Sequence, residues 1–158
     1  MPEDYLSEKF LVPLLQKLVR HPSEQTDLQE ADPEIKAFIR DCLAPEIKRL
    51  EIGAFRYDDM GNLILEIGPA DIGRSILFMT YAMTHPASEM PDPFSAELID
   101  TSAGAAVRGR GVAEQKTAMA AAVAAIAQAA HTDLGGRLIF AAVSAGEPQG
   151  LARGLKSL

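Results

Sequence analysis

The stretch that most constrains the fold is residues 107–130, which read VRGRGVAEQKTAMAAAVAAIAQAA. A short apolar approach, two glycines around Arg110 and an alanine-rich run predict a strand, a tight turn and a helix in that order. Glu114 falls in the first turn of this helix, where free N–H groups and the positive end of the helix dipole favour a carboxylate. The stretch therefore has the geometry of a site, although an isolated glutamate at such a position is more often a plain surface charge.

The chain has 158 residues, of which 47% are hydrophobic, so we expect one compact domain with a core of its own. The net charge of −7 leaves no dominant basic surface, so no nucleic-acid partner is expected. Cys42 is the single cysteine, which excludes an internal disulfide, and its helical spacing from Ile35 and Phe38 places it in the core. The N-terminus lacks the pattern of a signal peptide, and the alanine-rich helix is too short to cross a bilayer. We therefore expect a cytoplasmic protein with no membrane partner.

Two helices are expected before residue 51. Apolar residues recur at helical spacing between positions 6 and 18, and Pro13 interrupts them, which predicts either a kink or two short helices. A second helix is expected to begin where Asp32 caps and Pro33 occupies the first turn. Pro45 is expected to restart it.

After Gly53 the apolar pattern changes period, and four strands are expected besides the one that leads into Gly109. Residues 54–57 and 63–67 flank a turn and predict a hairpin, whereas residues 75–80 and 137–143 are continuous apolar runs typical of buried strands. The first of these runs is expected to be a central strand covered on both faces. Helices alternating with buried strands predict an α/β domain, in which ligands gather outside the carboxyl ends of the strands.

Three loops are expected at such strand ends: residues 81–85, 109–114 and 146–147. A phosphate-binding loop is excluded in the second of them, because Gln115 stands where that motif needs its last glycine. A simpler anion or nucleotide site remains open as a hypothesis, in which the glycine turn and the helix N-terminus bind the anion and Arg110 and Lys116 are cationic partners. Glu114 in the same turn argues against it.

Four motifs occur in one order along the chain: D-x-x-G-N at residues 58–62, D-P-F at 92–94, G-R-G-V-A-E-Q-K at 109–116, and Gly-Glu at 146–147 after a buried strand. This order resembles the co-catalytic zinc metallopeptidases that include acetylornithine deacetylase, succinyl-diaminopimelate desuccinylase, aminoacylase and glutamate carboxypeptidase. The resemblance covers nearly the whole chain. It implies the N-terminal part of a catalytic domain with a three-layer α/β/α mixed sheet. It also implies hydrolysis of an amide bond in N-acyl amino acids or small peptides, by two metals bridged by an acidic residue and a water.

The resemblance places three candidate metal ligands. Glu114 occupies the bridging position, where the family usually has aspartate, and Glu147 matches the second acid of the family's Glu-Glu pair. His85 lies near the first motif and could supply an imidazole from a shifted loop, although a lone loop histidine is usually solvated. Zinc is the metal that the resemblance implies.

Three other positions depart from the family pattern. Gly146 falls on the general base, so no group to activate water is present there. The His-x-Asp motif falls on Tyr81-Ala82-Met83, which lacks both the imidazole ligand and the carboxylate that would orient it. No catalytic residue is therefore assigned, and we expect this chain alone to be inactive.

Residues 1–158 are thus expected to form a single partial catalytic domain without a lid or dimerisation domain. An incomplete sheet exposes an apolar edge or face, which predicts self-association or a complementing chain. Three functions stay open: a divergent or truncated amidohydrolase, a non-catalytic relative that acts as a binding or assembly module, and the anion binder. For an active enzyme, the substrate would be a small N-acyl amino acid or peptide.

Overall fold

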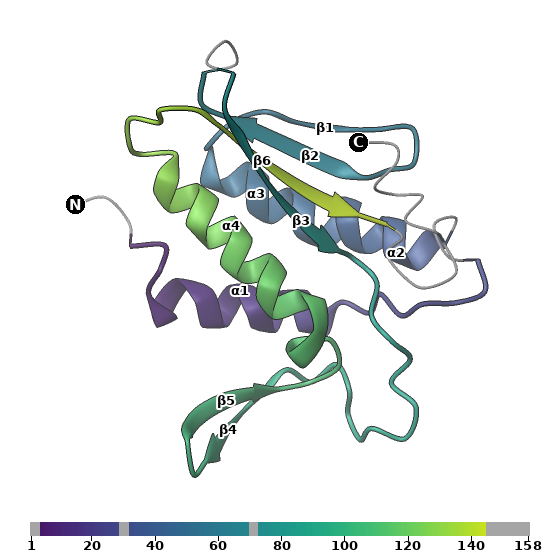
Figure 1. The fold of residues 1–158 in the computed structure, drawn as a ribbon. Helices are drawn as coiled ribbons and strands as arrows, with labels where there is room; N and C mark the ends of the chain where they lie inside the picture. The colour runs from purple at the N-terminus through teal and green to yellow at the C-terminus, as the bar shows by residue number, and fades with distance from the viewer. Residues whose placement is uncertain (1–3, 29–31, 70–72, 145–158) are drawn as a thin grey trace.

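The computed structural model describes residues 4–28, 32–69 and 73–144 (Figure 1). The helical elements, in chain order, are α1 (Glu8–Arg20), α2 (Pro33–Ala37), the π-helical segment η2 (Phe38–Leu43), α3 (Ala44–Leu50), the π-helical turn η3 (Val112–Lys116) and α4 (Thr117–Ala129). The strands are β1 (Phe55–Tyr57), β2 (Leu63–Ile67), β3 (Ser75–Tyr81), β4 (Glu97–Thr101), β5 (Gly104–Arg108) and β6 (Arg137–Val143). The expected sequence of strand, turn and helix over residues 107–130 is confirmed.

Four strands form a mixed sheet in the order β1-β2-β6-β3. β1 with β2 and β2 with β6 are antiparallel, whereas β3 and β6 are parallel. The predicted hairpin is therefore present, and both predicted apolar strands form. A second, two-stranded sheet is the β4–β5 hairpin, which projects from the body in Figure 1.

The helices follow their sequence signals with one difference. Pro13 lies inside α1, which stays a single helix because Phe10 and Leu14 face the core on both sides of it. Asp32 caps α2 as predicted, its Oδ1 accepting a hydrogen bond of 2.8 Å from the Glu34 N–H. The restart predicted at Pro45 corresponds to α3, which has Pro45 in its first turn and follows η2 without a break.

One face of the four-stranded sheet packs against the helices. Leu65, Phe140 and Phe78 lie beside one another across β2, β6 and β3 on this face, and they join a core with residues from α1, η2, α3 and α4. Cys42 is buried in this core, as predicted. The α/β class and the mixed sheet are confirmed. Within the described residues all helices pack against this one face, so the second helical layer of the predicted arrangement is not found there.

The expectation that residues 75–80 form a central strand covered on both faces is wrong for the described sheet. β3 lies at its edge, and the residues Ile76 and Leu77 are 58% and 47% exposed. An uninterrupted apolar run indicates a strand whose side chains can be buried. It does not tell which strands lie on either side of it in the sheet. In the described residues no helix is long and apolar enough to span a membrane.

Candidate functional site

Two glycines shape the turn between β5 and η3. Gly111 has a φ of +88°, and a Cβ at this position would lie 2.8 Å from Thr84 Cγ2. Gly109 packs so closely on α1 that a Cβ would overlap Val19 Cγ1. Because only glycine tolerates these contacts, the two positions bring η3 directly against the end of α1 and the loop after β3.

Lys116, at the end of η3, is a fully buried lysine. Its Nζ donates hydrogen bonds of 2.9 Å to the Leu18 carbonyl and 2.7 Å to the His21 carbonyl, and it lies 4.7 Å from the centre of the Phe38 ring. These carbonyls end α1, where the helix itself supplies no partners, so Lys116 acts as an internal C-cap. Burial lowers the pKa of Lys116 to about 8.

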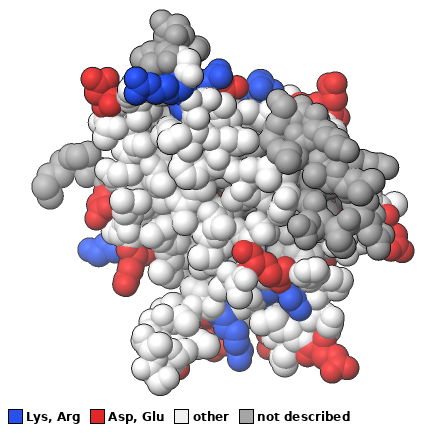
Figure 2. All heavy atoms as spheres, in the orientation of Figure 1, with Lys and Arg blue, Asp and Glu red and all other residues white. Residues whose placement is uncertain are grey.

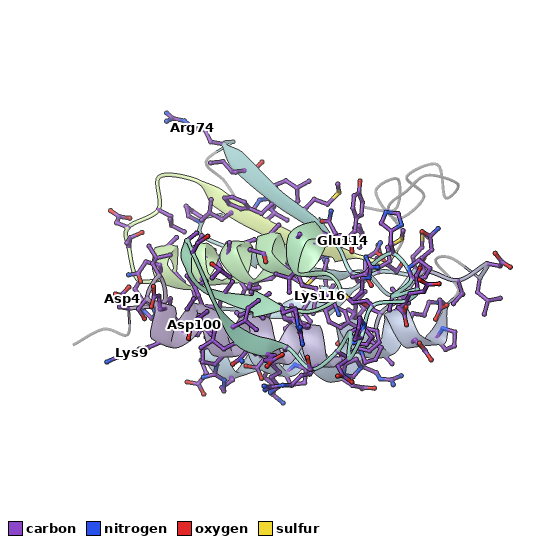
Figure 3. The ribbon with its side chains drawn as sticks, turned by 90° about the horizontal axis from the view of Figure 1, so that it is seen from below. Asp4, Lys9, Arg74, Asp100, Glu114 and Lys116 are labelled. Carbon is purple, nitrogen blue, oxygen red and sulfur yellow. The ribbon has the colours of Figure 1, made fainter. Side chains whose placement is uncertain are left out.

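Glu114, two residues earlier, points to the other side of the turn (Figure 3). Its Oε1 accepts a hydrogen bond of 2.9 Å from Arg110 Nη1, and its Oε2 accepts one of 2.9 Å from the His85 backbone N–H. Burial raises the pKa of Glu114, but the hydrogen bonds from His85 and Arg110 and the charge of Arg110 outweigh this effect. The pKa of Glu114 therefore lies below its ordinary value. Glu114 is an anion whose two oxygens both bind donors of the protein itself.

The loop after β3 is held from both sides. Thr84 N–H donates to the Ser23 carbonyl at 2.8 Å, and the Ala87 N–H donates to the Glu24 carboxylate. From the opposite side, Arg110 Nη2 donates to the Ala87 carbonyl at 3.4 Å. Glu24 thus holds the loop to the segment after α1, whereas Glu114 and Arg110 hold it to the turn at η3.

A cavity of about 290 Å³ opens between this loop and η3. Its lining combines the end of β3, the following loop and the first turn before α4: Tyr81, Met83, Thr84, His85, Ala113, Glu114 and Gln115. The structure therefore brings two of the predicted ligands, Glu114 and His85, to one cavity. Gly146 and Glu147 lie outside the described residues.

Among the described residues, the side chains that line the cavity do not fit a zinc site. Zinc is held by three or four imidazole, thiolate or carboxylate ligands. In residues 4–28, 32–69 and 73–144 no group of three such side chains is close enough to hold a metal ion. Glu114 is already hydrogen-bonded through both oxygens, and Tyr81 and Met83 offer a phenol and a thioether.

The structure does not support the hypothesis of an anion site, because both cations that such a site would use are bound to other groups of the protein. Lys116 Nζ is buried against the carbonyls of α1, so it cannot reach a ligand at the turn. Arg110 is bound to Glu114, which also places a negative charge in the cavity. The sequence gives the right residue types for an anion site, but the side chains face other partners.

Solved structures of peptidases share this arrangement of elements. Human carnosine dipeptidase 1 matches with a TM-score of 0.73 and 18% identity, over 94% of this chain and 34% of its own. An M20 family metallo-carboxypeptidase from Sulfolobus solfataricus gives a TM-score of 0.68 and 16% identity, over 85% of this chain and 30% of its own. A tripeptidase from Staphylococcus aureus gives 0.66 and 18%, over 96% of this chain and 40% of its own. No protein-family model and no curated protein matches the sequence significantly.

The chain has part of the M20 peptidase fold. It spans 34%, 30% and 40% of the length of these three structures, or about a third. The resemblance drawn from the sequence motifs is confirmed at the level of the fold.

The D-x-x-G-N motif at residues 58–62 has a structural role that the sequence prediction missed. Asp58 Oδ1 accepts hydrogen bonds of 2.9 Å from the backbone N–H groups of Met60 and Asn62, which closes the hairpin turn. Asn62 Oδ1 in turn accepts a hydrogen bond of 2.7 Å from the Ser144 N–H, at the end of β6. D-x-x-G-N therefore ties the hairpin to the strand that leads into residues 146–147. The spacing predicts the turn, whereas the contact with Ser144 needs the register of the sheet.

Proposed function

We propose that this chain is a non-hydrolytic relative of the metal-dependent amide hydrolases that keeps part of their fold as a binding or assembly module. The observation that carries the proposal is the bonding of Glu114. A bridging carboxylate directs its two oxygens at two metal ions. Glu114 directs them at the guanidinium of Arg110 and the backbone amide of His85. The motif order and the shared fold support descent from a peptide hydrolase.

The remaining positions of the catalytic pattern support the same proposal. Gly146 has no side chain to activate a water molecule, and Tyr81 and Met83 stand where the resemblance places an imidazole and its orienting carboxylate. A site without metal ligands has no metal-bound water to activate, so it needs no general base. The residues at positions 81, 83 and 146 are therefore consistent with one another.

A competing proposal is a zinc site built from Glu114, Glu147 and His85. It is favoured by the cavity that Glu114 and His85 share. For this site to form, Glu114 has to exchange the hydrogen bonds from Arg110 and the His85 amide for bonds to the metal. Binding would then cost the protein two charge-assisted hydrogen bonds.

The two proposals are separated by titrating zinc into the metal-free protein by calorimetry. The variants are Glu114→Gln, Glu147→Ala and His85→Ala, and the matched control is Glu97→Gln, another carboxylate paired with an arginine. We expect that the wild type either does not bind zinc or binds it no more tightly than the three site variants do. Micromolar binding, about −8 kcal/mol, that is lost in Glu114→Gln and kept in Glu97→Gln would establish the metal site instead.

Hydrolysis is tested separately with N-acyl amino acids and dipeptides, with and without zinc. We expect no turnover above that of the buffer with the same metal. Turnover by the wild type that disappears in Glu114→Gln would overturn the non-hydrolytic proposal.

A further inference from the structure

The loop between β3 and β4 is strained at several points along its backbone. Figure 1 shows it as a long connection that leaves the end of β3 and returns to the start of β4. In the described part of the chain four residues other than glycine have a positive φ, and three of them lie in this loop: Ser88 (+52°), Asp92 (+44°) and Ala96 (+51°). Residues with a side chain rarely adopt this conformation, so contacts with the rest of the protein have to hold it in place.

Both ends of the loop are anchored in the body of the protein. Thr84 is buried, and its N–H donates to the Ser23 carbonyl at 2.8 Å. Ala96 is also buried, and its carbonyl accepts a hydrogen bond of 2.9 Å from Gln16 Nε2. Between these anchors no side chain of residues 85–95 is buried. Few buried contacts are typical of a segment that opens locally while the rest of the structure stays folded.

The backbone of Ala87 is the main point at which the loop is fastened between its anchors. Its N–H donates to the Glu24 carboxylate, and its carbonyl accepts a hydrogen bond of 3.4 Å from Arg110 Nη2. The backbone N–H of Arg110 also donates to the Pro93 carbonyl at 2.7 Å. Arg110 therefore binds the loop at two points. Because these fastening groups lie outside the loop, the loss of one of them is expected to release a strained segment.

The same loop covers one side of the cavity beside Glu114. Thr84 and His85 line this cavity, and the His85 N–H donates to Glu114 Oε2 at 2.9 Å. Arg110 Nη1 donates to the other oxygen, Oε1, at 2.9 Å. Acidic and basic side chains lie beside one another near the start of α4 in Figure 2, and the ion pair of Arg110 with Glu114 belongs to this turn. Movement of the loop away from η3 therefore widens the cavity and frees Glu114 Oε2.

We propose that residues 85–95 form a lid over the Glu114 cavity and that Arg110 holds this lid closed. The lid opens as one unit about its two anchors, Thr84 and Ala96. In the closed state its first amide occupies one oxygen of Glu114. A ligand with a positive charge or a hydrogen-bond donor can reach that oxygen only after the lid has opened, so the lid controls access to the cavity.

This inference rests on the proposed function only in assuming that the cavity binds a ligand. Opening of the lid is measured without a ligand, so the two proposals fail separately. A loop that does not open would leave the non-hydrolytic proposal standing. Zinc binding or hydrolysis through Glu114 would overturn the non-hydrolytic proposal and leave the lid in place.

The test is amide hydrogen exchange followed by NMR. Two lid amides report on opening, because each donates to a carboxylate outside the lid. The His85 N–H donates to Glu114. The Ala87 N–H donates to Glu24. Amides of β6, which lies between β2 and β3, report on global unfolding. We expect the two lid amides to be protected to a similar degree, and less than those of β6.

Three variants distinguish a lid that opens as one unit from contacts that break independently. Arg110→Gln removes a fastening but leaves the acceptors of both reporter amides in place. Glu24→Ala removes the acceptor of the Ala87 amide and keeps that of the His85 amide. Arg108→Gln is the matched control, because it breaks an arginine ion pair of 2.6 Å within the β4–β5 hairpin. Circular dichroism checks that each variant is folded.

We expect both reporter amides to exchange about fivefold faster in Arg110→Gln than in the wild type. In Glu24→Ala both are expected to exchange faster, although the acceptor of the His85 amide is intact. Arg108→Gln is expected to leave both rates unchanged. Unchanged rates in Arg110→Gln, or an acceleration in Glu24→Ala that is confined to Ala87, would overturn the proposal. Reporter amides as protected as those of β6 would also overturn it, because the loop would then open only when the whole protein unfolds.

Discussion

Glu114 and Lys116 lie two residues apart on the same π-helical turn, yet the protein uses their charges in opposite ways. Lys116 is fully buried and bonded to the carbonyls that end α1. Glu114 lines an open cavity, with 23% of its side chain exposed, and is bonded to Arg110 and to the loop after β3. Lys116 holds the turn to the helical layer, and Glu114 holds it to the loop at the end of β3.

The difference teaches that one motif can supply contacts that build the fold as well as a side chain that lines the cavity. Gly109 and Gly111 bring the backbone close to α1 and Thr84, and Lys116 caps α1 through this contact. None of these contacts requires a metal. Together they give the glycine turn and the lysine a structural role that does not depend on metal binding at the cavity.

The largest effect is expected from removing the buried lysine. Lys116→Ala leaves two carbonyls of α1 without a donor and creates a cavity beside Phe38, so we expect the free energy of unfolding to fall by about 3–5 kcal/mol. The measurement is urea unfolding, with the exposed Lys48→Ala as the control, for which we expect a change within about 0.5 kcal/mol. Similar losses for the two variants would contradict the capping role of Lys116.

The stability of the wild type should also depend on pH through Lys116. Its pKa is lowered to about 8 in the folded protein from 10.5, so between these values the unfolded chain binds a proton that the folded chain does not. Stability from this group therefore rises with pH, by about 2–3 kcal/mol between pH 8 and 10.5. The measurement is the difference in unfolding free energy between wild type and Lys116→Met at several pH values. A difference that does not change with pH would show that Lys116 titrates normally.

A smaller effect is expected at the glycine turn. In Gly111→Ala the new Cβ meets Thr84 Cγ2 at 2.8 Å and Lys116 Cδ at 2.9 Å, at a φ of +88°. We expect a loss of about 1–3 kcal/mol. Gly104→Ala is the matched control, because Gly104 also has a positive φ, +111°, but its Cβ would meet nothing within 4 Å. Equal losses would mean that backbone conformation alone, and not close packing, requires glycine at position 111.

The smallest effect is expected at the ion pair in the cavity. Glu114→Gln and Arg110→Gln each remove one charge from a partly exposed pair, so we expect losses of about 1 kcal/mol. A double-mutant cycle on unfolding free energies gives the coupling between the two side chains. A coupling of zero would contradict the 2.9 Å bond between Arg110 Nη1 and Glu114 Oε1.

Local sequence signals predicted much of the fold. The cap at Asp32, the hairpin at residues 54–67 and the helix after Gly111 each depend on neighbouring residues, and the structure contains all three. The edge position of β3 depends on which strands lie beside it, and a single apolar run does not encode this.

The candidate site was predictable only in part. The strand-end rule brought His85 and Glu114 into one cavity from residues far apart in the chain. The direction of each side chain was not predictable, because Lys116 and Arg110 carry the same charge and only the packing of α1 decides that one is buried.

The most direct measurement is a carboxyl-carbon NMR titration of Glu114, with and without zinc, in the wild type and in Arg110→Gln. We predict a pKa for Glu114 below its ordinary value, a higher pKa in Arg110→Gln, and a resonance that zinc does not move at neutral pH. A resonance that shifts when zinc is added, together with a pKa that does not respond to Arg110→Gln, would contradict the structural role of Glu114 and restore it as a metal ligand.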